Sequence, residues 1–567
     1  MAEGILLTVV VLFSILAFLP PIEDPDFWWH LRTGDLISAS GGLPAHDPFS
    51  FASKGAPPVR AGFILSSYWL AQLSYHLLFA LGGAWGVVAG RAILLSLTFG
   101  TGYVRMRRFG VDRILAAVLL AGSVAMYSSL YFGDRPQVYS FLGAGLLAWW
   151  MDRIRSGREP SALILPLMAI WSNLHGGFVI GDLLLVAFAV GALVEFRSMP
   201  GRLVRILAWV AGGILVSFAN PNGFGAIPAT LELGRDPLLL TFVDEYQSTA
   251  ELFSMGRHSI AVAWGLIACL PAAMFLARRV YWPDLFVWAV AGALAARYAR
   301  NVGFYLVVVV PTCGYYLQQA LTTLRGRRVR PFALAGLVSI AVVLMVQQTG
   351  RLLDRGSPLR EGVSGQFPEG AAQFLSRTPG AHRVFNEYDW GGYLLWRNFP
   401  GQENFIDGRI LDPRRVVDYA RVLWAVPDGP DGAPSYARLL DDWRIDAVIQ
   451  RLYMEMGNVP PLILALLDDP MWIPAYVDDQ AVVLLRSPRP LGEQEWLARR
   501  AMWLSRTLGV LDDRIARGPA DFRPHLARAQ FLATAGLLDE ARRSVLAARQ
   551  LAPQNPFVID LSARLGL

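Results

Sequence analysis

The sequence predicts a polytopic α-helical membrane protein with about eleven transmembrane helices, followed by an α/β domain and a short helical tail. Hydrophobic residues make up 54% of the 567 residues and charged residues only 17%, which is unusual for a water-soluble protein. Long apolar segments recur up to residue 350. Beyond it, short apolar runs alternate with Pro, Gly, Asp and Arg, as in soluble domains.

The first apolar segment, 4–20, has no small-residue cleavage site after it, so we expect a retained span rather than a signal peptide. The stretch 66–80 is interrupted by polar residues, and we expect it to form an interfacial helix. Further segments of span-like hydropathy lie at 84–104, 113–131, 138–151, 161–174, 177–195, 206–219, 259–277, 283–298, 302–321 and 332–348.

Arginine clusters occupy every second loop between these segments, which is the pattern of the positive-inside rule. The net charge of +6 therefore indicates a membrane topology and not a nucleic-acid partner. The rule places the N-terminus in the cytoplasm and puts 20–83, 132–137, 220–258 and everything after 349 outside. The clusters are Arg105, Arg107 and Arg108; Arg153, Arg155 and Arg158; Arg197, Arg202 and Arg205; Arg278 and Arg279; and Arg325, Arg327, Arg328 and Arg330.

We expect a membrane domain at 1–350 with its first outer loop at 20–83, an extracytoplasmic α/β domain at 351–488, and a helical tail at 489–567. Short apolar runs at 383–385, 404–406, 447–449 and 481–485 predict the strands of the α/β domain. Glu387, Asp389, Asp407 and Arg409 lie near the strand ends, where turn formation is the simpler explanation for the two aspartates.

The tail carries small residues at the spacing of one tetratricopeptide repeat, in which they let paired helices approach closely. These residues include Ala527, Gly536, Ala541 and Ala548. A single repeat needs a neighbour to bury its face, and a helix over 493–517 would supply it. Such a tail predicts a protein partner.

Two acids open the first outer loop. Asp24 and Asp26 can share a divalent cation such as Mg²⁺ or Mn²⁺, or one can act as a general base while the other stays charged. If the stretch is helical, Asp26, His30 and Gly34 lie along one edge of it. A structural alternative has similar weight, because an aspartate before a proline is also a common helix cap.

Arginines on the predicted outer side are candidates for binding phosphate. Arg135 lies in a very short loop, where it can bind a phosphate or simply anchor the end of a span. Arg297 and Arg300 oppose the positive-inside rule, which favours an anionic ligand near them. Partnership with Asp244 or Glu245 is the structural alternative for this pair.

Aromatic residues and one histidine complete the set of candidate binding residues. Trp28 and Trp29 are suited to sugar or isoprenoid contact, although Trp is also enriched at bilayer interfaces. Tyr68 belongs to a later part of the same loop. His175, in the sequence Trp-Ser-Asn-Leu-His-Gly-Gly, can hold substrate or a metal, or merely form a tight turn.

The order of elements resembles the polyprenyl-phosphate-dependent glycosyltransferases of the GT-C superfamily. It comprises one span, an outer loop with an acidic start, interfacial helices, Tyr68-Trp69-Leu70, and a return span bounded by Ala89-Gly90-Arg91. The resemblance implies a polyprenyl-phosphate-linked sugar as donor, a glycan, lipid or protein as acceptor, and Asp26 as base or metal ligand. The C-terminal half also resembles bacterial membrane proteins of unassigned function, through 386–393 and 405–409.

The resemblance therefore predicts an integral-membrane glycosyltransferase that acts on the outer face of a bacterial inner membrane. On this prediction Asp26, Asp24 and His30 are catalytic, and the arginines, His175 and the aromatic residues bind substrate. The alternative is a non-catalytic assembly or transport component for an envelope polysaccharide, whose aspartates cap a helix and face no cavity. Proton-coupled transport is a third possibility, and Asp182 is its only mid-span acid.

Overall fold

The described residues form two compact units. The computed structural model describes residues 2–130, 133–237, 246–257, 260–323, 362–429, 432 and 434–567, with single positions between 339 and 350. The first unit comprises Met1–His46 and Pro58–Ser364, and the second comprises Asp47–Pro57 and Gly365–Leu567. The segment 47–57, assigned by sequence to the first outer loop of the membrane domain, thus groups with the C-terminal residues.

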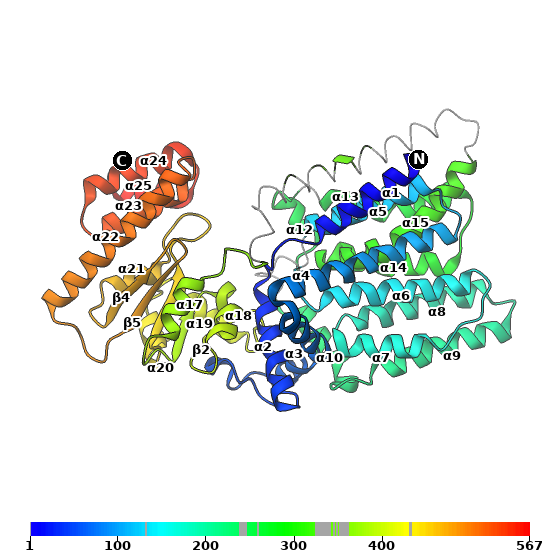
Figure 1. Ribbon diagram of the computed structural model, residues 1–567, viewed down its shortest axis with the longest axis horizontal. Coiled ribbons are helices and arrows are strands. Elements are labelled where there is room, and N and C mark those ends of the chain that lie inside the picture. The colour runs from blue at the N-terminus through cyan, green and yellow to red at the C-terminus, as the bar shows by residue number, and fades with distance from the viewer. Residues whose placement is uncertain are drawn as a thin grey trace. The chain divides into compact units, whose positions relative to one another are not determined.

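The first unit is a bundle of helices. Figure 1 shows its long helices lying alongside one another, with α2, α3 and α10 gathered at one end. In chain order the helices are α1 (Ala2–Ala17), α2 (Pro25–Ser40), α3 (Pro58–Ser66), α4 (Trp69–Arg108), α5 (Arg113–Leu130), α6 (Gln137–Arg155), α7 (Ile164–Leu174), α8 (Phe178–Glu195), α9 (Pro200–Ser217), η2 (Gly223–Gly225), α10 (Ala226–Arg235), α12 (Thr249–Ser254), α13 (Ala261–Ala277), α14 (Trp282–Arg297), η5 (Ala299–Asn301) and α15 (Val302–Thr323).

Five helical stretches among the described residues are long and apolar enough to cross a membrane: α4, α5, α8, α9 and η5 with α15. The helices α7 and α13 are apolar but shorter. Each of the five matches a segment predicted from the sequence, whereas the total of about eleven stays a prediction. The expected span at 332–348 lies almost entirely outside the described residues.

The helix α4 is interrupted near its middle. Gly82 and Gly83 have non-helical backbone angles, and Gly83 has a φ of 58°, a conformation that favours glycine. The break separates residues 69–81, which pack along α2, from the apolar stretch that continues to Arg108. It falls between the expected interfacial helix and the expected span.

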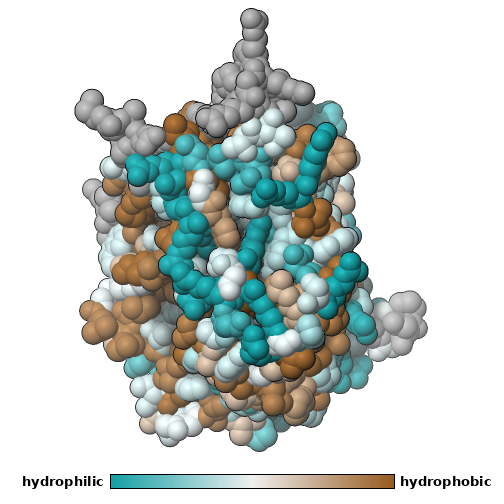
Figure 2. Space-filling model, turned by 90° about the vertical axis from the view of Figure 1, so that its right-hand side faces the viewer, coloured by the Kyte–Doolittle hydropathy of each residue, from teal (hydrophilic) through white to brown (hydrophobic). Residues whose placement is uncertain are grey.

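The four described arginine-rich loops meet at one end of the bundle. Arg105 pairs with Asp152 at 2.6 Å, and Arg155 pairs with Asp284 at the same distance. Glu195 accepts a hydrogen bond from the backbone of Trp282, which connects a third loop with the fourth. Figure 2 shows hydrophilic side chains gathered on the face of this unit that lies to the right in Figure 1. The predicted topology requires these loops to lie together on one side of the membrane.

The second unit contains one mixed sheet of five strands among its described residues, in the order β2-β1-β3-β5-β4. The strands are β1 (Arg383–Asn386), β2 (Glu403–Asn404), β3 (Ala447–Arg451), β4 (Trp472–Val477) and β5 (Ala481–Arg486). β1 pairs in parallel with β2 and β3, and β5 runs antiparallel to β3 and β4. The helices around it are η1 (Phe51–Ser53), α17 (Glu369–Ser376), η6 (Tyr388–Trp390), α18 (Gly391–Asn398), α19 (Arg414–Leu423), α20 (Tyr436–Asp442) and α21 (Pro461–Leu467).

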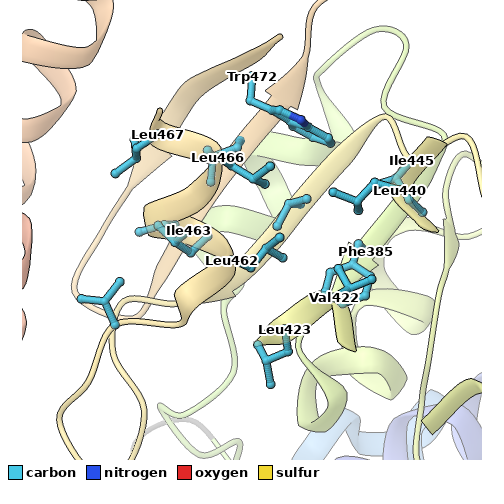
Figure 3. Close-up of a cluster of buried hydrophobic side chains, with 14 of the residues drawn as sticks. Phe385, Val422, Leu423, Leu440, Ile445, Leu462, Ile463, Leu466, Leu467 and Trp472 are labelled. Atoms are coloured by element: carbon cyan, nitrogen blue, oxygen red, sulfur yellow. The ribbon is translucent and has the colours of Figure 1, made fainter. Parts of the chain in front are cut away.

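The core of this unit lies between the sheet and the helices α19, α20 and α21. Figure 3 shows Phe385 of the sheet with Val422 of α19, and Leu462 and Leu466 of α21 beside Trp472. The segment 47–57 contributes Phe51 to the same core. β4 was not predicted from the sequence, because Pro474 lies inside it; its pairing with β5 shifts register between Pro474 and Tyr476.

The tail is helical, as predicted, with α22 (Glu493–Arg517), α23 (Phe522–Thr534), α24 (Leu538–Leu551) and α25 (Pro556–Arg564). Trp503 and Leu511 of α22 and Phe531 of α23 belong to the core of the α/β residues, so the tail is continuous with them. The helices α23 and α24 pack closely on each other and, with α25, enclose a small core of their own. The tetratricopeptide assignment stays a prediction.

Candidate active site

Asp24 begins helix α2. Its backbone is extended, with φ −72° and ψ 120°, and its side-chain Oδ1 accepts a hydrogen bond from the backbone N–H of Asp26 at 2.8 Å. Pro25 follows at the first helical position, where its missing N–H has no cost. The capping role that the sequence offered as an alternative is therefore present at Asp24.

The same two carboxylates meet Arg135. Its Nε lies 2.7 Å from Oδ2 of Asp24, and its Nη2 lies 3.2 Å from Oδ2 of Asp26. The Asp24 side chain is 5% exposed, against 15% for Asp26 and 25% for Arg135. Burial raises the pKa of Asp24 to about 7, even though Arg135 opposes the shift, and the charge of Asp26 raises it further.

The loop before α6 is shaped around the Asp24 carboxyl. Gly133 has a φ of 65°, and a Cβ at this position would lie 1.7 Å from Oδ2 of Asp24. The next residue, Asp134, is buried and pairs at 2.5 Å with Arg91 of α4. Arg91 also donates to the backbone carbonyls of Phe18 and Pro20, so it connects this loop with the end of α1.

Aromatic side chains of α2 and of the residue before α4 pack around His30. Its ring lies 3.5 Å from that of Trp29 and 5.1 Å from that of Tyr68, measured between centroids, and its Nδ1 lies 3.3 Å from Nε2 of Gln72. Trp28 is fully buried. The predicted candidates of the first loop are thus neighbours within the first unit, although Trp28 and His30 have little exposed surface.

A cavity of about 420 Å³ lies in the first unit. Tyr68, His175 and Arg300 line it, whereas Asp24, Asp26, His30, Arg135, Arg297, Trp28 and Trp29 are not among its lining residues. The rest of its wall comes from α3, α6, α8, α10 and the region around η5. It includes Phe63, Gln137, Ile180, Leu183, Leu231, Arg235, Tyr246, Tyr298 and Phe304.

Tyr68 connects the cavity to the acidic cluster. Burial raises the pKa of its hydroxyl, and the charges of Arg300, Asp26 and Arg135 all act on it. The ring of Tyr68 lies 5.6 Å from that of His175. The carboxylates therefore lie within electrostatic range of a residue in the cavity wall.

The two arginines predicted on the outer side, Arg297 and Arg300, lie in different surroundings. Arg300 lines the cavity and lies over the ring of Tyr246 at 4.6 Å, and its backbone carbonyl accepts a hydrogen bond from Gln137 at 3.1 Å. Arg297 is exposed and lies over the ring of Tyr298 at 4.7 Å. The alternative partners at 244 and 245 lie outside the described residues.

The contacts at Asp24 and Asp26 fit a guanidinium better than a divalent cation. Both oxygens of Asp24 and one of Asp26 already face N–H donors, and the positive charge between the carboxylates is Arg135. Within the described parts of the chain, no three His, Cys, Asp or Glu side chains come together as metal ligands. The predicted Mg²⁺ or Mn²⁺ stays a prediction and has no role in the chemistry below.

Sequence reasoning missed several supporting residues. Ser140 contacts His175, and Gly133 contacts Asp24, yet each lies in an apolar or turn segment without a motif of its own. Trp171 lies in the segment that the sequence singled out around His175, but its contact with Ser140 was not predicted. The glycines in the segment after His175 were the available signal, since paired glycines at a turn often accommodate a close contact.

Comparisons with known proteins support the predicted fold. No protein-family model matches the chain, and no curated protein matches it. The oligosaccharyltransferase AglB from Archaeoglobus fulgidus, solved with an inhibitory peptide and a dolichol-phosphate, is similar with a TM-score of 0.53, 13% identity, and coverage of 87% of this chain and 75% of that chain. At this identity the likeness shows a shared fold and nothing more.

Two other solved structures have lower scores. The same oligosaccharyltransferase in complex with Zn and sulfate has a TM-score of 0.49, 13% identity, and coverage of 97% and 85% of the two chains. ArnT from Cupriavidus metallidurans, bound to undecaprenyl phosphate, has a TM-score of 0.44, 16% identity, and coverage of 87% and 99%.

Proposed function

We propose that this chain is an integral-membrane glycosyltransferase that moves a sugar from a polyprenyl-phosphate carrier to an acceptor on the extracytoplasmic face. One observation carries the proposal: Tyr68 lines a cavity together with Arg300, and the charge of Asp26, one of the carboxylate pair at the start of α2, acts on the same tyrosine. The donor class follows the dolichol-phosphate of the AglB structure.

The cavity offers both kinds of surface that a lipid-phosphate sugar requires. Leu183 of α8 and Leu231 of α10 line it and are exposed, so isoprenoid units can pack on them. Arg300 in the same wall can hold the phosphate by charge-assisted hydrogen bonds. Aromatic side chains such as Tyr246 and Tyr298 can stack on the sugar.

Asp26 is the better placed of the two carboxylates to act as the base. It is more exposed than Asp24, whose two oxygens are occupied by the helix cap and by Arg135. The acceptor oxygen or nitrogen would attack the anomeric carbon and give its proton to Asp26. The bond between that carbon and the phosphate oxygen would break, and Arg300 would hold the departing phosphate.

The decisive variant is Asp26→Asn in the full chain. It removes the base but keeps the shape of the side chain, and a general base contributes about 100-fold or more to a rate. The matched control is Asp35→Asn on the same helix, where the carboxylate pairs with Arg32 and His76. Mass spectrometry of lipid-linked sugars and envelope glycans would show loss of transfer in the first variant only, and full transfer in Asp26→Asn would refute the proposal.

The non-catalytic alternative also has an observation in its favour, because Asp24 caps α2 and neither aspartate lines the cavity. An assembly or transport component would tolerate Asp26→Asn with unchanged envelope glycans. The same experiment therefore separates the two functions.

The setting of the enzyme forms part of the proposal. We place the chain in a bacterial inner membrane with a cytoplasmic N-terminus and an extracytoplasmic second unit. That unit would gather a glycan, lipid or protein acceptor, and the helices α22 to α25 would bind a protein partner. Accessibility of single introduced cysteines to an impermeant thiol reagent would test the orientation.

A further inference from the structure

Two hydrogen-bond donors face the same ring nitrogen of His175, Nδ1. The backbone N–H of Gly177 lies 3.0 Å from Nδ1, and Oγ of Ser140 lies 2.7 Å from the same atom. A backbone N–H can only donate, so Nδ1 must accept and carries no proton. In the neutral ring the proton then resides on Nε2.

Trp171 orients the hydroxyl group of Ser140 so that it can donate to Nδ1 of His175. Its indole Nε1–H can only donate, and it lies 2.7 Å from Oγ of Ser140. The serine oxygen therefore accepts from the tryptophan, and its own hydrogen is available for Nδ1 of His175. All three side chains are buried, at 0% exposure for Ser140, 1% for Trp171 and 8% for His175.

Three glycines make room for this chain of hydrogen bonds. A Cβ at Gly177 would lie 2.6 Å from Oγ of Ser140 and 2.7 Å from Nδ1 of His175. Cβ atoms at Gly143 of α6 and Gly181 of α8 would lie 2.6 Å and 2.7 Å from the indole of Trp171. The backbone on three sides is thus shaped around the indole and the imidazole.

We propose that His175 presents its Nε2–H to the cavity as a neutral hydrogen-bond donor for a phosphate oxygen of the lipid carrier, with Ser140 and Trp171 as positioning residues. This inference rests on the proposed function, because it concerns the same cavity. His175 and Arg300 both line that cavity, which gives an anionic group there a neutral donor and a permanent cation as possible partners.

The arrangement excludes two other roles for the histidine. An imidazole with its proton on Nε2 and donors facing Nδ1 has no free lone pair, so it is neither a general base nor a metal ligand. Protonation of Nδ1 would place it against the N–H of Gly177. Burial and the charge of Arg300 lower the pKa of His175 to about 3, and Tyr68 is a further titratable group whose ring lies 5.6 Å from the imidazole.

Binding of farnesyl phosphate to the purified full chain tests the contact, with farnesol as the phosphate-free control. The wild type should prefer the phosphate, and His175→Leu should lose roughly 10- to 100-fold of that preference, the strength of a hydrogen bond to a charged group. His175→Gln, whose Nε2 can replace the imidazole donor, should retain most of it. Equal thermal unfolding midpoints of the two variants would show that both fold.

Nitrogen-15 NMR tests the tautomer without any ligand. The chain has seven histidines, and the His175 signal is the one that disappears in His175→Gln. It should report a neutral ring protonated on Nε2 that does not titrate between about pH 5 and 8. Ser140→Ala and Trp171→Phe should shift the Nδ1 signal, because the first removes and the second releases one of the two donors to that atom, while the N–H of Gly177 keeps the tautomer. An unshifted signal in both variants would contradict their positioning role.

The outcomes separate the two proposals. A wild type without preference for farnesyl phosphate over farnesol would overturn the lipid-phosphate donor and this contact together. If the wild type prefers farnesyl phosphate and His175→Leu keeps the same preference, only the role of His175 is overturned. A ring protonated on Nδ1, or one that titrates in the measured range, would also overturn it.

Discussion

Burial raises the pKa of the Asp24 carboxyl and Arg135 lowers it, and the effect of burial is the larger. The pKa of Asp24 is raised from 3.8 to about 7. The folded chain therefore holds a proton that the unfolded chain has released between these two values. The resulting stabilisation is fully present below pH 3.8 and is lost as the pH rises through about 7.

This sign leads to a prediction for Asp24→Asn. The amide keeps the capping oxygen but does not titrate, so the unfolding midpoint of the variant should depend less on pH between 3.8 and about 7. Differential scanning calorimetry of both proteins across this range measures the difference. Burial also raises the pKa of Glu387 to about 7, and the comparison of two otherwise identical chains cancels its contribution. Parallel midpoints would show that Asp24 does not hold the proton.

Gly133 allows a second prediction. Gly133→Ala places a methyl group on the Asp24 carboxylate in a left-handed backbone, and we expect a loss of about 2–4 kcal/mol in stability. The control is Gly122→Ala, because Gly122 lies inside α5 with nothing within 4 Å of a built Cβ. Thermal unfolding in one detergent compares the two. Equal midpoints would mean that the loop adapts without cost.

Individual candidate residues could be identified from the sequence, because the residue type and its immediate neighbours were sufficient to suggest a role. A conspicuous acid pair and misplaced arginines are visible without a fold. Their contacts were not predictable, since Asp24 and Arg135 are 111 positions apart and Ser140 and His175 are 35 apart. The division of Arg297 from Arg300 depends on which way a single turn of η5 faces, and hydropathy carries no such information.

At the scale of elements, α15 shows how a broken helix is repaired inside an apolar bundle. Pro311 has no N–H, so the carbonyl four residues earlier, that of Val307, loses its donor. Nη1 of Arg105 donates to this carbonyl at 3.0 Å and to that of Val308 at 3.1 Å, and its Nε pairs with Asp152. An arginine in the bundle thus satisfies backbone groups that lipid cannot.

Arg105→Met should therefore destabilise the chain by about 3–5 kcal/mol, because it removes the guanidinium from the part-buried carboxylate of Asp152 and leaves the carbonyl of Val307 without its donor. Arg205→Met is the matched control, since Arg205 pairs with Glu159 at an exposed position and its loss should have little effect. Unfolding midpoints in detergent test both. A similar response of the two variants would contradict the repair role of Arg105.

Helices with long apolar runs could be predicted from the sequence, whereas elements with a mixed hydropathy pattern could not. The apolar runs that became α4, α5, α8, α9 and α15 stand out by hydropathy alone. The edge strand β4 does not, because Pro474 interrupts its pattern and only half of its residues are fully buried. The helix α22 was predictable to the residue, since its ends coincide with a Pro-rich break and a glycine.

At the scale of the whole molecule, the segment 47–57 is the main departure from the sequence-based domain plan. Its Asp47 pairs with buried Arg409 at 2.6 Å, and Arg409 also pairs with Asp407 at 2.6 Å. Phe51 packs in the core of the second unit, and Ser50 forms a bridge with Asn404. No apolar period marks these residues as part of a distant core, because they are rich in Pro, Ser and Gly.

A complementation experiment tests this assignment. Residues 365–567 expressed alone should unfold at a lower temperature than the same fragment with a peptide of residues 47–57, because the peptide binds only the folded form. A peptide with Phe51→Asp should fail to stabilise it. An unchanged midpoint with the native peptide would show that the segment is dispensable to the second unit.

The path of the chain between its two units also constrains how such a protein can evolve by gene rearrangement. The polypeptide passes between the units after His46, after Pro57 and after Ser364. A gene rearrangement with one breakpoint near 364 would remove most of the second unit but leave Asp47 and Phe51 without their partners. Loss or exchange of this unit between relatives therefore requires two coordinated events, and we expect the two units to be inherited together.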